Sequence, residues 1–146
     1  MQALALDLDA VLADTRPLWC DWLEDAARRT HVELDMPNDR AAAAVLLDER
    51  LGDWRPLLDR FAADRAPVYF RPHADTGAVL RRLQAAGVRV GVFTDAPRGL
   101  AELALAHVGA ARRVATVGTL DEVLHELGDG AVIIRSRAEL KAAAED

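Results

Sequence analysis

The chain has 146 residues, of which 51% are hydrophobic and 29% charged, and its formal net charge is −6. This length suits one domain, or a core with a small insert, and the composition favours a packed core over intrinsic disorder. The acidic balance argues against nucleic-acid binding, and no apolar run is long enough to span a membrane. The single cysteine, Cys20, excludes an intramolecular disulfide and a cysteine-based zinc cluster. Since residues 1–8 lack the layout of a signal peptide, we expect a cytoplasmic protein, with an oligomeric state that the sequence leaves open.

The first predicted element is a short apolar strand at residues 3–8 that ends among acidic residues. Similar strand-like runs occur at residues 88–93, 114–117 and 131–134. Helical patterns span residues 75–86, 97–108 and 119–127, and a last helix opens at Ser136. This alternation of strands and helices predicts an α/β fold with parallel strands joined by right-handed crossovers.

Between about Thr15 and Arg71 the strands and helices do not alternate, because only helical patterns occur there. Three helices are predicted, at residues 17–29, 38–51 and 53–63, separated by proline and glycine. We therefore expect an all-helical insert. Its three tryptophans are expected to hold these helices together, with lining of a ligand cleft as the alternative; they are Trp19, Trp22 and Trp54.

Chemistry is expected where the strands end, because ligands of open parallel sheets bind beyond the carboxyl ends of the strands. The first strand delivers Asp7 and Asp9 there, two residues apart and so on one face of the strand. Two adjacent carboxylates need a metal or a shared proton, unless they only form an acidic turn. The second strand ends at Thr94 and Asp95, just before the amino end of a helix that could bind an anion. Capping of that helix is the structural alternative for Asp95.

Two strings of residues resemble signatures of a known family. Residues 6–15 (LDLDAVLADT) resemble the first signature of the haloacid dehalogenase superfamily, and residues 90–95 (VGVFTD) resemble the second. The helical insert lies where many members carry a small helical cap. The resemblance covers nearly the whole chain and implies a three-layer Rossmann-like core of residues 1–14 and 72–146, with a cap of residues 15–71.

The resemblance also implies residue roles. Asp7 would be the nucleophile that forms an aspartyl-phosphate, and Asp9 the general acid and base. Thr94 would hold the phosphoryl oxygens, with Asp95 and Arg98 beside it. Magnesium would be held by Asp7 and by the backbone carbonyl of Asp9, and the substrate would be a small phosphorylated molecule.

The chain departs from the family pattern at two places. The family supplies a lysine ahead of its fourth strand, where this chain offers only Arg112 or Arg113. The family then ends that strand with acids that complete the magnesium site. Here Arg135 takes the first acidic position and Glu139 the second, and Glu139 could instead cap the helix that opens at Ser136.

Two functions follow from these observations. In the first, the chain is a magnesium-dependent phosphatase of a small phosphorylated metabolite, with Glu139 completing the metal site. In the second, it keeps the fold for binding or regulation, and Arg135 replaces the metal by pairing with Asp7 and Asp9. A receiver-like signalling domain is a more distant alternative, which the long insert and the missing lysine disfavour.

Overall fold

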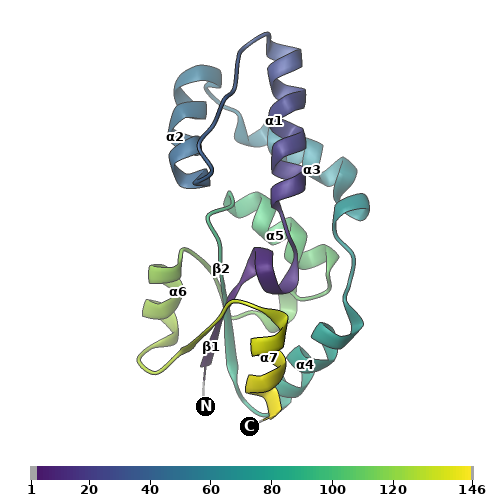
Figure 1. Cartoon of the computed structure of the whole chain (residues 1–146), viewed down its shortest axis with the longest axis vertical. Coiled ribbons are helices and arrows are strands. Elements are labelled where there is room, and N and C mark those ends of the chain that lie inside the picture. Colours follow the sequence, from purple (N-terminus) through teal and green to yellow (C-terminus); the bar gives the residue numbers. More distant parts are fainter. Residues whose placement is uncertain (1–2, 146) are drawn as a thin grey trace.

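The computed structural model describes residues 3–145, so that residues 1, 2 and 146 of the expected core lie outside the described range. Within that range the strands form a four-stranded parallel sheet in the order β3-β2-β1-β4. Their bounds are Ala3–Asp7 (β1), Arg89–Phe93 (β2), Thr116–Gly118 (β3) and Val132–Ile134 (β4). Figure 1 shows this sheet in the lower part of the molecule, with three helices of the insert above it.

The core is a three-layer α/β arrangement, as predicted. Its helices are α4 (Ala74–Ala85), α5 (Arg98–His107), α6 (Leu120–Leu127) and α7 (Arg137–Glu145). Among the described residues, α6 packs on one face of the sheet, whereas α4, α5 and α7 belong to the main core on the other face. From β1 the chain first adds β2 and β3 on one side of this strand and then adds β4 on the other side. The direction of the crossovers therefore changes at β1. Such a switch point is where open α/β sheets bind ligands.

The helix boundaries follow local sequence signals. Thr119 and Glu122 form a reciprocal capping box at the start of α6, as their spacing predicts. Gly87 and Gly109 follow α4 and α5 with φ angles of 79° and 76°, a left-handed conformation that suits glycine. Gly91 has a different role, because a Cβ there would lie 2.6 Å from Val123 Cγ1 of α6. Its missing side chain lets α6 approach the sheet.

The insert contains α1 (Arg16–Thr30), α2 (Arg40–Leu51) and α3 (Arg55–Tyr69). Helix α3 continues past Pro67 to Tyr69, whereas the sequence pattern predicts a helix that ends at residue 63. The proline lies in the last turn, where loss of one amide donor costs less than in the middle of a helix. Three buried tryptophans pack together between α1 and the start of α3, with ring centres 5.5–6.0 Å apart; they are Trp19, Trp22 and Trp54. They form the core of the insert.

The insert contacts the core mainly through α3, which lies against α5. Gly99 of α5 permits this close approach, because a Cβ there would lie 2.5 Å from Asp59 Oδ1 of α3. Helix α2 is held differently, since it buries only Arg40, Ala43 and Leu47. In the described part of the chain, no helix is long and apolar enough to cross a membrane.

Candidate functional site

A cavity of about 540 Å³ lies at the carboxyl ends of the strands, between the sheet and the insert. The side chains that line it from the core include Asp7, Asp9, Phe93, Thr94, Asp95, Arg98 and Arg135. Arg16, Asp39 and Ala41 line it from the starts of α1 and α2, and the start of α6 completes the wall. The amino ends of four helices therefore meet at one cavity, each contributing partial positive charge.

The first strand ends earlier than predicted, at Asp7, and the chain enters a π-helical turn at Leu8–Leu12. The amide N–H of Ala13 donates to Leu8 O at 2.9 Å and closes this turn. The turn places Asp9 off the strand, so that its amide N–H donates to Asp7 Oδ1 at 3.2 Å. Both carboxylates line the cavity, yet their surroundings differ.

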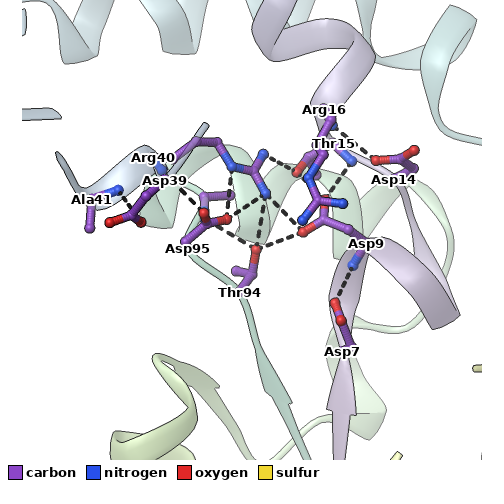
Figure 2. Close-up of polar contacts among 11 residues, drawn as sticks. Asp7, Asp9, Asp14, Thr15, Arg16, Asp39, Arg40, Ala41, Thr94 and Asp95 are labelled. Atoms are coloured by element: carbon purple, nitrogen blue, oxygen red, sulfur yellow. Dashed lines mark hydrogen bonds and ion pairs between the residues drawn. The ribbon is translucent and has the colours of Figure 1, made fainter. Parts of the chain in front are cut away.

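Both carboxylate oxygens of Asp9 accept two hydrogen bonds each (Figure 2). Oδ1 accepts from the amide and the hydroxyl of Thr15, at 2.8 and 2.5 Å. Oδ2 accepts from Arg40 Nη2 at 2.8 Å and from Thr94 Oγ1 at 2.9 Å. The Asp9 side chain is only 3% exposed, so it is a buried and fully hydrogen-bonded carboxylate.

Arg40, the first residue of α2, is the centre of this network. Its guanidinium is 1% exposed and lies between Asp9 on one side and Asp95 on the other (Figure 2). Nε donates to Asp95 Oδ1 at 2.9 Å, and Nη1 donates to Thr15 Oγ1 at 2.7 Å. The backbone N–H of Arg40 donates to Asp95 Oδ2 at 3.1 Å. One side chain thus joins the insert to the carboxyl ends of β1 and β2.

The network keeps Asp9 ionised. Burial by itself would raise the pKa of Asp9, because a carboxylate loses hydration in the interior. The hydrogen bonds from Thr15, the positive charge of Arg40 and the hydrogen bond from Thr94 outweigh burial and hold the pKa of Asp9 below its ordinary value. Asp9 is therefore a poor proton donor near neutral pH in this arrangement.

Thr94 and Asp95 are engaged in the same network. Thr94 Oγ1 donates to Asp9, accepts from the amide of Ala96 at 3.1 Å and lies 3.5 Å from Arg40 Nη2. Asp95 does not provide a side-chain cap for α5, whose first turn has no such hydrogen bond. It pairs with Arg40 instead, which removes much of the negative charge that it would present to an anion.

Arg135 lies in the cavity but makes different contacts from those expected. No ion pair joins it to Asp7 or Asp9 within residues 3–145, and Arg40 takes that place beside Asp9. The Arg135 guanidinium carbon instead lies 5.3 Å from the centre of the Phe93 ring. This cation–π contact holds the arginine over the end of β2.

Three predicted site residues lie outside the cavity. Glu139 Oε2 accepts from the amide of Arg135 at 3.2 Å, while the amide of Glu139 donates to Ser136 Oγ at 3.1 Å. These bonds are those of a helix start, which is the structural alternative for Glu139. Arg112 and Arg113 belong to a short 3₁₀ turn at Ala111–Arg113, where Arg113 donates to Gln84 Oε1. Neither arginine lines the cavity, whereas Arg98 does.

The residues present do not fit the magnesium site that the resemblance implies. Glu139 is used at the start of α7, and a permanent cation, Arg135, stands among the lining residues. No group of three or more possible His, Cys, Asp or Glu ligands occurs between residues 3 and 145. Asp7 is the one expected ligand whose carboxylate faces the cavity without an ion pair in the described residues. A divalent cation prefers several oxygen ligands, which this set does not supply.

Sequence reasoning missed Arg40 and the side-chain role of Thr15. Arg40 follows an ordinary cap, Asp39, and precedes an alanine run, so the local pattern suggests a solvated residue. One weak signal was present, because a cation at the first position of a helix opposes the helix dipole. Such a residue is tolerated best where acids face it, as Asp9 and Asp95 do here.

Comparisons with known proteins bear on the fold. No family model matches the sequence, and no curated protein matches it. Among solved structures, a "putative beta-phosphoglucomutase" from Thermotoga maritima is similar, with a TM-score of 0.56. The sequences are 16% identical, and the match covers 99% of this chain and 82% of that chain. The chain therefore has a Rossmann-like α/β fold, similar over nearly its whole length to the fold of that protein.

Proposed function

We propose that the chain binds a small phosphorylated metabolite at the carboxyl ends of β1 and β2, and that Arg40 holds Asp9 in a state that does not hydrolyse it. The observation that carries this proposal is the buried ion pair between Arg40 Nη2 and Asp9 Oδ2, at 2.8 Å. A general acid needs a raised pKa and a free proton, whereas Asp9 is ionised and has both oxygens occupied.

The surroundings of the cavity favour an anion. The first turn of α5 has no side-chain cap, so its amide N–H groups are available to a ligand, whereas at the start of α1 the amide of Arg16 donates to Asp14 Oδ1 at 3.1 Å and Pro17 has no N–H. Each helix also begins with an arginine, Arg16 or Arg98, that lines the cavity. Amide groups at helix starts together with guanidinium groups suit a phosphate monoester.

A second candidate is the phosphatase that the resemblance implies, with Asp7 as nucleophile. The observation that favours it is the Asp7 carboxylate, which accepts one backbone hydrogen bond and otherwise faces the cavity. In that reaction Asp7 attacks phosphorus, the ester oxygen leaves with a proton, and water cleaves the aspartyl-phosphate. That proton would have to come from Asp9. The ion pair between Arg40 and Asp9 would therefore have to break before Asp9 could be protonated.

Two measurements on the purified full chain separate the candidates. Calorimetric titration with inorganic phosphate and p-nitrophenyl phosphate tests binding, and release of p-nitrophenol with and without magnesium tests hydrolysis. Asp7→Asn is the control for the second measurement. Binding without turnover above that control supports the binding protein. Turnover that is lost in Asp7→Asn supports the phosphatase, and absence of binding to every phosphorylated probe in a metabolite panel overturns the proposal.

A further inference from the structure

The position of Arg135 gives the cavity a fixed positive charge beside Asp7. Strand β4 pairs in parallel with β1, with Ile134 opposite Leu6. The residue after Ile134 therefore leaves the sheet next to the end of β1, where Asp7 lies. Phe93, whose ring carries the Arg135 guanidinium, is the partner of Asp7 on the other side of β1. The guanidinium thus reaches across the end of β1.

A guanidinium at this place can supply the positive charge that a metal ion would otherwise supply to an anion. Arginine stays protonated at every accessible pH, and its planar fork matches two oxygens of a phosphate group. The same charge repels a divalent cation that approaches Asp7.

Two further arginines face the cavity from other elements. Arg16 begins α1 and Arg98 begins α5, so that three guanidinium groups approach from different sides. Neither Arg16 nor Arg135 forms an ion pair with an acid of residues 3–145, and Arg98 forms only an exposed one with Glu102, at 3.6 Å. Arg98 Nη2 also donates to Val117 O at 2.6 Å, so the charges of Arg16 and Arg135 are the ones most available to a ligand.

The opposing acids of the cavity are mostly occupied. Asp9 and Asp95 share Arg40, while Asp39 and Glu122 accept backbone N–H groups at the starts of α2 and α6. Asp7 is the acid left facing the three arginines. A ligand with a phosphate group and neutral hydroxyl groups would suit the arginines and Asp7 alike, because the phosphate accepts from the arginines and the hydroxyl groups can donate to Asp7.

We infer that this site binds phosphate monoesters without a metal ion, with Arg135 supplying the positive charge. The inference rests on the proposed function and specifies how the same site recognises its ligand. It separates the chain from relatives whose site needs magnesium, because here the charge on the ligand is met by side chains alone.

The test is calorimetric titration of the full chain with inorganic phosphate and p-nitrophenyl phosphate, in EDTA and in magnesium. Equal affinity in the two buffers is the expected result. Arg135→Gln should weaken binding about tenfold or more, as loss of hydrogen bonds to a charged group implies. Arg135→Lys should restore part of the loss, because it keeps the charge without the fork. Arg112→Gln, an exposed arginine outside the cavity, is the matched control and should bind as the wild type does.

The outcomes distinguish this inference from the proposed function. Binding only in magnesium overturns metal-free recognition, and Arg135→Gln that binds as tightly as the wild type overturns the role of Arg135. Either result leaves the binding function standing. Absence of binding in either buffer overturns both. Circular dichroism spectra of the variants establish that a weakened variant is folded.

Discussion

At the scale of single residues, the main feature of the molecule is a charged group that is buried completely. Arg40 is compensated by two carboxylates and a threonine hydroxyl, and no buried polar side-chain atom within residues 3–145 lacks a partner. A buried charge that loses its partner is costly, whereas an intact network is not. Removal of any one side chain of this network should therefore lower the free energy of unfolding strongly.

Replacement of Arg40 by alanine should lower the free energy of unfolding by about 3–5 kcal/mol, because it leaves Asp9 buried and without its ion pair. Urea denaturation followed by circular dichroism measures this change. Arg50→Ala, on the exposed side of the same helix, should change stability by no more than about 0.5 kcal/mol. Equal effects of the two substitutions would show that the buried pair does not stabilise the fold.

The Asp9 carboxylate should also make stability depend on pH. Its pKa in the folded protein lies below the ordinary value, so its contribution is complete above about pH 4 and is lost as the pH falls through the folded pKa. The difference in unfolding free energy between the wild type and Asp9→Asn should therefore be largest at neutral pH and shrink in acid. Urea unfolding of both proteins at several pH values measures it, and a constant difference would contradict the assignment.

At the scale of elements, the close contact between β2 and α6 depends on one missing side chain. Gly91→Ala would place a Cβ 2.6 Å from Val123 Cγ1, so we expect a loss of about 1–3 kcal/mol in unfolding free energy. Gly77→Ala in α4 is the matched substitution, because its new Cβ would have a nearest contact of 3.5 Å. It should stabilise the helix by about 0.5–1 kcal/mol. Urea unfolding of the two variants should therefore give shifts of opposite sign.

The elements are also where sequence reasoning worked best. Apolar runs and capping residues predicted each strand and helix of the core, because both signals act within a few residues. The π-helical turn at Leu8–Leu12 and the continuation of α3 past Pro67 were not predicted. The π-helical turn accepts a hydrogen bond at Val11 O from Arg137, 126 residues away, and a local pattern does not contain such contacts. The contacts of Arg40 could not be predicted from a local pattern either, since its partner Asp95 lies 55 residues away in the sequence.

At the scale of the whole molecule, the insert and the core are joined at two places of different character. Helix α3 packs on α5 through a close helix contact, whereas α2 reaches the core through the Arg40 network. Segments with few buried apolar groups open locally at low free energy. Helix α2, with Ala43 and Leu47 as its only buried apolar residues, should behave in this way once Arg40 is removed.

Amide hydrogen exchange measured by mass spectrometry tests this view of the molecule. In Arg40→Ala, exchange in α2 should rise at least about tenfold relative to Arg50→Ala, because loss of about 1.4 kcal/mol of local stability already produces that factor. Exchange in α3 should change less, since this helix packs on α5 of the core. A uniform increase across both helices and the sheet would mean that the network stabilises the molecule as a single unit. An increase confined to α2 would mean that Arg40 fixes this helix over the cavity, as the proposed function requires.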